Sequence, residues 1–354
     1  MKVVYINKYF FPMERHSGIL NFAYDLCNSL AQKLDLEVIS WKYSKEIPNR
    51  KDLNNYSVHR VRSPFRLYSA ILAKHLRPDI VILGSGIIYP GILLFVVLLL
   101  KIISPGIPLV IYQHSIFKQP SISLSCFFNR LCAGFWFSNP YQKDQIKKRI
   151  YIDCVYVSVG LDPKRLDSIT FVQKQYDIRI GYFGHLSKSK GVDRLIRAFL
   201  KLDNRNCELL IAGTGPLKGK LEEIATKREN INIYGYLKDV LGYMKSCDII
   251  VFPYREDIAI LGLSLSCLEA MALGKPIIVS NSITLIPLIK PGYNGFIFEK
   301  ERELVRYLKL LINDQEKRRR MGERAKNLAK KYSIAEIANK VNELIKETLN
   351  VEGD

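Results

Sequence analysis

The chain has 354 residues, a length at which one hydrophobic core usually gives way to two, so we expect two domains. Hydrophobic residues make up 48% of the chain and charged residues 25%, without a low-complexity tract or short repeat, which excludes disordered and repeat proteins. The formal net charge is +19, and residues 1–165 hold 22 basic against 10 acidic residues, which indicates either an acidic partner on that half or an adaptation for solubility.

The cysteines and apolar runs bear on the compartment. Seven cysteines are scattered without a Cys-x-x-Cys pair, which is typical of small core residues in a reducing compartment. The N-terminus reads as a strand and a turn and not as a signal peptide. The longest apolar run, 91–103, contains Lys101 and is shorter than the roughly 18–20 residues of a membrane span. We therefore expect a cytoplasmic protein, in which this run is either a buried helix or dips into a membrane surface.

Strand and helix patterns alternate from the N-terminus onward. Val- and Ile-rich runs separated by helical patterns predict a parallel sheet covered by helices on both faces. In the first half, the expected strands are 2–6, 36–40, 56–62, 79–83 and 108–114, and the expected helices are 18–33, 64–76 and 91–103.

After a polar stretch at 163–177 the same alternation starts again. The expected strands are 178–184, 207–213, 231–237, 248–254, 275–280 and 295–299, with helices at 191–202, at 217–228, in a short segment before 248 and from 265. Two more helices are expected in 316–349, and the basic stripe there is typical of a solvated face because no aromatic residues interleave with it.

These patterns predict an α/β protein of two doubly wound, Rossmann-like domains facing each other across a cleft. The expected domains are 1–165 and 166–335. Helix 336–354 is expected to pack back on the N-terminal domain.

Four turns of the second domain are rich in glycine or small residues and follow predicted strands, at 183–191, 212–216, 234–237 and 261–265. Free backbone N–H groups at such turns, together with a helix dipole, bind anions, and neighbouring lysines can complete a diphosphate site. The chain has neither a Gly-x4-Gly-Lys-Ser/Thr loop nor an N-terminal Gly-x-Gly-x-x-Gly, which argues against a P-loop nucleotidase and a dehydrogenase.

Several motifs resemble glycosyltransferase family 4, the retaining, nucleotide-sugar-dependent transferases with the two-Rossmann GT-B fold. The resemblance covers nearly the whole chain, and it implies that domain 1–165 lies on the acceptor side and that domain 166–335 binds the donor. The segments that carry it are "MKVVYINKYFFP", "VIYQHS", "GHLSKSKGVDRLIRAF", "LLIAGTGPLKGKLEEIA", "LGLSLSCLEAMALGKPIIVS" and "GYNGFIF".

The resemblance implies a role for each matching residue. Glu269 would bind the ribose hydroxyls of the donor, Lys190 the diphosphate and leaving group, Gly18 would let backbone approach the phosphates, and His114 would contact the transferred sugar near the reacting carbon. The catalytic candidates are thus His114 and Lys190. The full donor-binding set is Gly18, His185, Lys190, Gly213, Gly215, Leu237, Gly262, Leu263, Ser264, Leu265 and Glu269.

Some positions depart from the family pattern. Leu261 stands where the first glutamate of Glu-x7-Glu would hold sugar hydroxyls, and a leucine accepts no hydrogen bond. Glu256 and Asp257, just before it, are candidates to replace that acid. His185 replaces an arginine and lacks its bidentate fork. Thr284–Leu285 replaces Gly-Gly, and Leu288 replaces a following acid.

The resemblance implies transfer of a sugar from a nucleotide diphosphate-sugar to an acceptor hydroxyl with retained anomeric configuration. We expect no cofactor and no metal, because the chain has no Asp-x-Asp motif. The expected acceptor is a lipid-linked or cell-surface glycan. An anionic membrane surface is a further candidate partner, since the basic helix 64–76 and the apolar helix 91–103 share one domain. The alternative is a non-catalytic GT-B subunit. Nucleic-acid binding rests on charge alone and is not expected.

Overall fold

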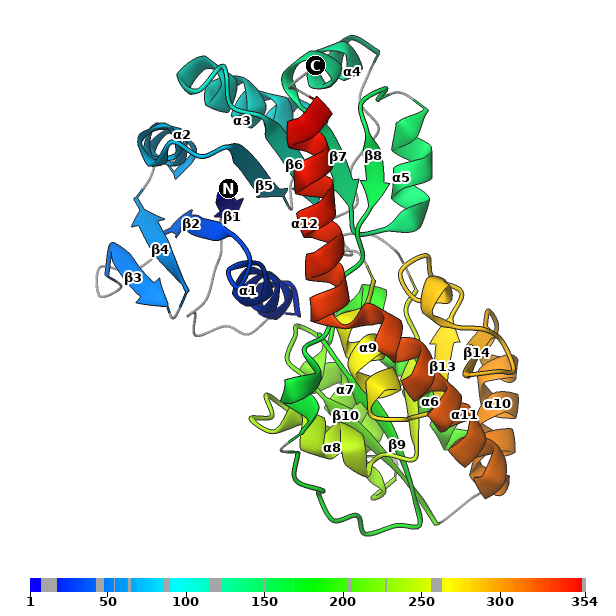
Figure 1. Cartoon of the computed structure of the whole chain (residues 1–354). Helices are drawn as coiled ribbons and strands as arrows, with labels where there is room; N and C mark the ends of the chain where they lie inside the picture. The colour runs from blue at the N-terminus through cyan, green and yellow to red at the C-terminus, as the bar shows by residue number, and fades with distance from the viewer. Residues whose placement is uncertain are drawn as a thin grey trace. The chain divides into compact units, whose positions relative to one another are not determined.

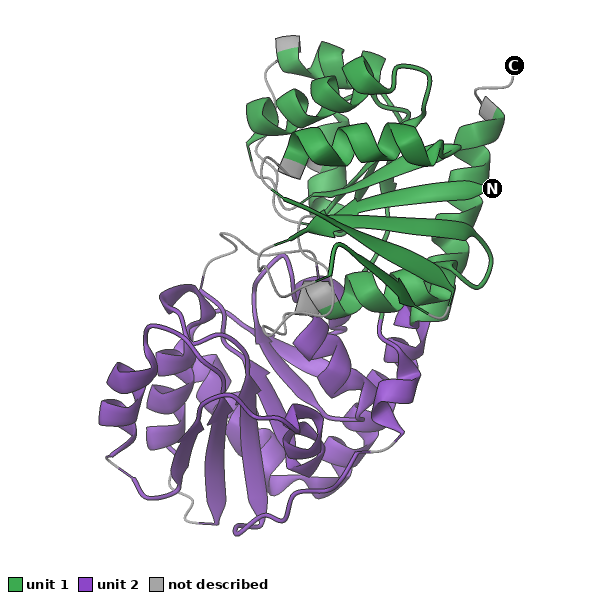
Figure 2. Ribbon diagram, turned by 90° about the vertical axis from the view of Figure 1, so that its left-hand side faces the viewer, with its two compact units in different colours: residues 1–160, 259–262, 334–354 green, residues 161–258, 263–333 purple. Residues whose placement is uncertain are grey.

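A computed structural model describes residues 1–7, 18–42, 48–53, 55–62, 65–85, 89–114, 122–148, 150–167, 169–202, 206–226, 228–255 and 263–351. The described chain forms two compact units (Figure 2). Unit 1 comprises residues up to 160 and the last helix, which starts at Ile334. Unit 2 comprises the described residues from 161 to 255 and from 263 to 333. The chain thus passes between the units after residues 160 and 333, where the sequence predicts boundaries after 165 and 335.

Unit 1 is built on an eight-stranded sheet in the order β3-β4-β2-β1-β5-β6-β7-β8. Neighbouring strands are parallel, except that β3 is antiparallel to β4. The strand order reverses between β1 and β5, where doubly wound sheets bind ligands. The strands are β1 (Lys2–Asn7), β2 (Asp35–Trp41), β3 (Arg50–Leu53), β4 (Tyr56–Val61), β5 (Ile80–Ser85), β6 (Leu109–Gln113), β7 (Gly134–Phe137) and β8 (Cys154–Tyr156).

Helices cover both faces of this sheet (Figure 1). On one face α3 lies between α2 and α4, and on the other α1 lies beside α12. Strand residues alternate between these faces: Val4 and Ile6 join the core beneath α2, α3 and α4, whereas Tyr5 points the other way. The helices are α1 (Gly18–Leu30), α2 (Phe65–Leu76), α3 (Pro90–Ile103), α4 (Ile122–Leu131), α5 (Pro140–Lys147) and α12 (Ile334–Val351).

Unit 2 is built on a six-stranded, fully parallel sheet in the order β11-β10-β9-β12-β13-β14. Its order reverses between β9 and β12. The strands are β9 (Ile178–Phe183), β10 (Cys207–Ala212), β11 (Ile231–Tyr234), β12 (Ile249–Phe252), β13 (Ile277–Ser280) and β14 (Gly295–Phe298).

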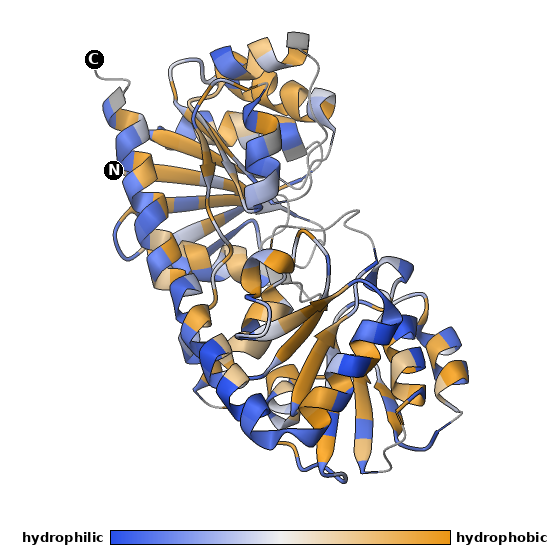
Figure 3. Ribbon diagram, turned by 90° about the vertical axis from the view of Figure 1, so that its right-hand side faces the viewer, coloured by the Kyte–Doolittle hydropathy of each residue, from blue (hydrophilic) through white to orange (hydrophobic). Residues whose placement is uncertain are grey.

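Two groups of helices enclose this second sheet: α6 contacts α7 and α10, while α9 contacts α8 and α11. In Figure 3 the strands are mainly hydrophobic and the helices alternate between the two colours, as expected for amphipathic helices around buried strands. The helices are α6 (Val192–Leu200), α7 (Lys218–Ala225), α8 (Val240–Ser246), α9 (Leu265–Ala272), α10 (Glu301–Asn313) and α11 (Gln315–Ala329). Short 3₁₀ turns are η1 (Pro163–Leu166), η2 (Lys188–Lys190), η3 (Ile286–Leu288) and η4 (Lys330–Tyr332).

A buried ion pair joins two neighbouring strands of unit 2. Arg179 on β9 faces Glu208 on β10, and Nε of the arginine donates to the carboxylate at 2.7 Å. Both side chains are almost fully buried. The pair lies near the amino-terminal ends of the strands, at the edge opposite to the predicted donor site, so we assign it to strand pairing.

The predicted alternation of strands and helices is present in both units, which confirms the α/β, doubly wound fold class. The sequence patterns do not predict β3, β7, β8, α4, α5 and α10. The predicted helices also extend three residues beyond the C-termini of α1 and α7 and two beyond that of α6, because helical patterns there continue into turns.

Candidate functional site

The parallel sheet of unit 2 brings five turns to one edge. All six strands point the same way, so the segments after β9, β10, β11, β12 and β13 lie at its carboxyl edge. Lys190 lies in the turn after β9, and Glu269 lies in α9, the helix after β12. Since β9 and β12 are neighbours, the sheet places these two segments side by side at the point where its order reverses.

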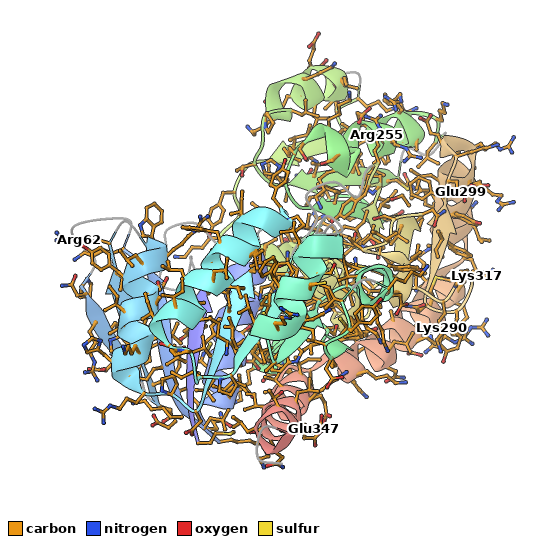
Figure 4. The ribbon with its side chains drawn as sticks, turned by 90° about the horizontal axis from the view of Figure 1, so that it is seen from above. Arg62, Arg255, Lys290, Glu299, Lys317 and Glu347 are labelled. Atoms are coloured by element: carbon orange, nitrogen blue, oxygen red, sulfur yellow. The ribbon has the colours of Figure 1, made fainter. Side chains whose placement is uncertain are left out.

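The turn after β9 is locked against the segment after β12. Gly191 ends η2 with φ 63°, a left-handed conformation, and a Cβ there would clash with the carbonyl oxygen of Pro253. The backbone N–H of Arg255 donates to the carbonyl of Ser189 at 2.7 Å, and its guanidinium, labelled in Figure 4, donates to Asp193 at 2.6 Å. Only glycine at 191 therefore allows η2 to approach the second segment so closely.

Lys190 is linked to the start of α9 through one buried aromatic ring. Its Nζ lies 3.7 Å from the centroid of the Tyr254 ring, a cation–π contact. The Tyr254 hydroxyl lies 3.3 Å from Oγ of Ser264, which caps α9 by accepting from the N–H of Cys267 at 3.4 Å. Burial raises the pKa of Tyr254 above its usual value, so its hydroxyl stays protonated. An ammonium group thus lies near a helix N-terminus, a combination that favours an anion.

Glu269 is a carboxylate buried in the second turn of that same helix, with 7% of the residue exposed. Nη1 of Arg165, in η1, lies 3.9 Å from its Oε1. A buried carboxylate is costly unless hydrogen bonds or an opposite charge compensate it, and the arginine supplies such a charge. The local sequence dictates a helix here, with a serine cap and the apolar residues Cys267, Leu268 and Met271 facing the core. An apolar residue would suit position 269 better than glutamate if packing alone decided.

Gly213 and Gly215 are required for backbone packing, in addition to their predicted role in binding the donor. A Cβ on Gly213 would clash with the carbonyl oxygen of Gly184, and one on Gly215 with that of Leu186. The N–H of Leu186 donates to the carbonyl of Thr214 at 2.9 Å. The turns after β9 and β10 therefore pack backbone to backbone, and glycine is required for that contact.

The remaining donor-site candidates are spread along the same edge. His185 is exposed and follows β9, and Leu237 is half-buried after β11. Leu263 is buried, and Leu265 is the first residue of α9. The candidates Gly262 and Leu261, with Glu256 and Asp257, lie outside the described residues.

The residues that depart from the family pattern at 284, 285 and 288 lie in the core. Thr284 and Leu285 are fully buried and Leu288 is nearly so. The carbonyl of Thr284 accepts the N–H of Ser264, so this loop fixes the start of α9 through its backbone. Neither residue 284 nor 285 has a positive φ, and glycine is therefore not needed at this point of the chain.

The two candidates of unit 1 lie at the carboxyl edge of its own sheet. Gly18 is the first residue of α1, and His114 directly follows β6. His114 is 3% exposed, and burial lowers its pKa to about 4. The backbone N–H of His114 donates to the carbonyl of Ser85, and Nε2 of its ring lies 3.3 Å from the Tyr5 hydroxyl. At neutral pH the imidazole is therefore uncharged and serves as a hydrogen-bonding group.

The structure adds Tyr254, Arg165 and Tyr5 to these predicted residues. Tyr254 ends the predicted strand 248–254, which precedes the small-residue turn at 261–265. That position is only a weak sequence signal of a functional role. The contact of Arg165 with Glu269 and that of Tyr5 with His114 join distant parts of the sequence, and no local pattern announces them.

Within the described ranges, no three His, Cys, Asp or Glu side chains gather to hold a metal ion. Among the described helices, none combines the length and apolarity needed to cross a membrane.

Comparisons with known proteins agree with this architecture. Residues 170–328 match the family model of glycosyl transferases group 1. A glycosyltransferase of uncharacterised specificity from Methanocaldococcus jannaschii, MJ1178, is 30% identical over 200 residues, which cover 54% of this chain and 53% of that protein. The capsular polysaccharide biosynthesis glycosyltransferase CapM from Staphylococcus aureus is 27% identical over 182 residues, covering 48% and 47%. The chain thus spans about half the length of the curated relatives it matches.

A solved structure extends the likeness of fold to the whole chain. The Anabaena protein Alr3699/HepE, crystallised in complex with UDP-glucose, aligns with a TM-score of 0.77 over 98% of this chain and 100% of its own, at 16% identity. Such low identity shows the fold alone. Residues 170–328 thus belong to the glycosyl transferases group 1 family, as the resemblance to glycosyltransferase family 4 implied, and the chain as a whole has the GT-B fold.

Proposed function

We propose that this protein is a retaining glycosyltransferase that moves a hexose from a nucleotide diphosphate-sugar to an acceptor hydroxyl without a metal ion. The observation that carries the proposal is the link from Lys190 through the Tyr254 ring to the capped start of α9, the helix that holds the buried Glu269. A nucleoside diphosphate requires a cationic turn that binds its diphosphate and a carboxylate that accepts hydrogen bonds from its two ribose hydroxyls.

In this proposal each residue has one task. Glu269 accepts hydrogen bonds from the two ribose hydroxyls, and Arg165 holds its charge in place. Lys190 and the N–H groups at the start of α9 neutralise the diphosphate. His185 adds a donor at the same edge but lacks the fork of an arginine. Gly18 lets the start of α1 approach the phosphates.

The reaction breaks the bond between the anomeric carbon and the diphosphate oxygen, whose electron pair leaves with the diphosphate. The acceptor hydroxyl forms the new bond on the face that the diphosphate leaves, and its proton passes to a departing phosphate oxygen. Charge builds up on the diphosphate in the oxocarbenium-like transition state, and Lys190 stabilises it there. His114 contributes as a neutral hydrogen-bonding group beside the reacting sugar, because its low pKa excludes an imidazolium at neutral pH.

The acceptor part of the proposal is a lipid-linked or cell-surface glycan reached from an anionic membrane surface. It is supported by the three adjacent helices α2, α3 and α4, which contain no acidic residue. Their outer surfaces carry large apolar side chains together with exposed Arg66, Lys74 and Arg130, and exposed Arg62 precedes them (Figure 4). The exposed apolar residues are Leu67, Tyr68, Ile71, Ile92, Phe95, Ile102 and Phe127.

A cytoplasmic location, peripheral to the membrane, fits the same picture. Nearly all cysteines are buried as free thiols, with Cys126 exposed, and none is paired in the described chain. That pattern suits a reducing compartment.

The test is turnover. Purified protein is mixed with UDP-glucose or GDP-mannose, lipid-extract vesicles and a chelator, and released UDP or GDP is measured. We expect release with one donor, a product of retained configuration by NMR, and a loss of about 10²-fold in Lys190→Ala. Lys220→Ala, an exposed lysine on α7, is the matched control and should keep full activity.

A non-catalytic GT-B subunit is the alternative, favoured by Leu261 in place of an acid. It predicts that UDP or GDP binds while neither donor is turned over. Restored activity on adding Mg²⁺ would instead contradict the metal-independent part of the proposal.

A further inference from the structure

His114 is the end of a chain of hydrogen bonds at the carboxyl edge of the unit 1 sheet. Nδ2 of Asn7 donates to the Tyr5 hydroxyl at 3.4 Å, and that hydroxyl lies 3.3 Å from Nε2 of His114. Asn7 and Tyr5 lie on β1, and His114 follows β6. All three side chains belong to unit 1, and Tyr5 is 1% exposed.

The direction of the second bond follows from counting protons. A tyrosine hydroxyl has one hydrogen, and burial raises the pKa of Tyr5 far above its usual value, so the hydrogen stays in place. The hydroxyl oxygen already accepts from Asn7. Among the described residues, Nε2 of His114 is the one acceptor within hydrogen-bond distance of the hydroxyl, so the hydroxyl hydrogen is donated to Nε2. A neutral imidazole that accepts at Nε2 carries its proton at Nδ1.

The protonated nitrogen is the one without a partner. Nδ1 of His114 is buried and has no hydrogen-bond partner among the described residues. Buried N–H groups are almost always paired in native proteins, because an unpaired one loses its hydration without compensation. A buried, unpaired donor beside a ligand-binding sheet edge is what a site for an incoming oxygen atom requires.

The surroundings hold the ring in this orientation. The Tyr112 ring centroid lies 4.2 Å from that of His114, and Phe22 packs edge-on at 6.0 Å. On the neighbouring strand β5, a Cβ at Gly84 would lie 2.6 Å from the Tyr5 oxygen and 3.2 Å from Nδ2 of Asn7. Glycine at position 84 therefore leaves the space that the tyrosine hydroxyl occupies.

We infer that Tyr5 is a positioning residue that fixes His114 in the Nδ1–H tautomer, so that Nδ1 donates a hydrogen bond to a hydroxyl oxygen of the transferred sugar. The sugar as recipient rests on the proposed function. The tautomer does not, since it follows from contacts within unit 1.

The test is nitrogen NMR of protein labelled with ¹⁵N in its five histidine rings, at neutral pH and without ligand. His114→Asn identifies the His114 signals. We expect the proton on Nδ1 in the wild type and on Nε2, wholly or in part, in Tyr5→Phe. Tyr112→Phe is the matched control, because its hydroxyl is equally buried and its ring touches His114, yet it donates to the carbonyls of Val157 and Ser158. That variant should keep the Nδ1 proton.

A wild-type spectrum with the proton on Nε2 overturns the inference, whether or not the variants fold. An unchanged tautomer in Tyr5→Phe overturns the role of Tyr5. These results do not depend on turnover, so a failure of the proposed function is seen separately.

Where turnover is found, a second readout separates positioning from structural support. His114→Asn offers an amide donor near the place of Nδ1–H that needs no tyrosine to set a tautomer. We expect Tyr5→Phe to lower kcat about tenfold in the wild-type background and to have no further effect in His114→Asn. An equal loss in both backgrounds would contradict the inference.

Discussion

Burial decides what individual polar side chains in the two sheet edges can do. Glu269 lies almost out of contact with water, with Arg165 supplying an opposite charge, so it is held ready to accept hydrogen bonds. His114 is as deeply buried and has no charged partner among the described residues, and its imidazole stays neutral as a result. Both residues lie at positions that packing alone would give to apolar side chains, which is typical of functional sites.

The burial of His114 makes stability depend on pH. Its pKa is lowered from 6.5 to about 4 in the folded protein, so the unfolded chain binds a proton at a pH at which the folded protein does not. This contribution to stability is complete above pH 6.5 and is lost as the pH falls toward 4. The stability advantage of the wild type over His114→Asn should therefore shrink by about 2.5 kcal/mol from pH 7 to pH 4.5. Urea unfolding of both proteins at the two pH values measures it, and an equal advantage at both would contradict the buried, neutral imidazole.

At the scale of single elements, glycines that the sequence predicts for binding also have a role in packing. Gly213 and Gly215 are predicted to lie in an anion-binding turn, and both, like Gly191, are required where two backbones meet. Helix α3 was expected to be either buried or in contact with a membrane. Its inner face is packed against the sheet, while Ile92, Phe95 and Ile102 are exposed.

The outer face of α2, α3 and α4 yields a prediction about membranes. In a sedimentation assay at low salt, the protein should bind vesicles of phosphatidylglycerol and phosphatidylcholine more tightly than vesicles of phosphatidylcholine alone. Phe95→Glu removes an aromatic ring that would be buried in the membrane surface and adds a negative charge that anionic lipids repel. Binding to the anionic vesicles should therefore weaken about tenfold or more. Phe171→Glu is the matched control, because Phe171 in unit 2 has 55% exposure against 57% for Phe95. Equal weakening of vesicle binding by both variants would refute this docking face, and so would equal binding of the wild type to vesicles with and without phosphatidylglycerol.

At the scale of the whole molecule, the sequence predicts what is periodic or local. The alternation of apolar and helical runs predicts two doubly wound sheets, and parallel strands then bring the turns with Lys190 and Glu269 to one edge. Short elements such as β7 and β8, with four and three residues, carry too few residues for a pattern to stand out. The contacts of Arg165 with Glu269 and of Tyr5 with His114 arise from tertiary packing, which no local pattern contains.

The central claim is that the carboxyl edge of the unit 2 sheet binds the nucleoside diphosphate of a sugar donor through Glu269. Calorimetric titration of the protein with UDP and GDP, in the absence of metal, tests it most directly. Glu269→Gln keeps the size of the side chain and removes its charge, and Glu223→Gln does the same at an exposed position on α7.

The account predicts micromolar binding of one diphosphate, weakened tenfold to a hundredfold in Glu269→Gln because charged hydrogen bonds to the ribose are lost, and unchanged in Glu223→Gln. Binding that is equal in the two variants, or no binding of either diphosphate to the wild type, would contradict it.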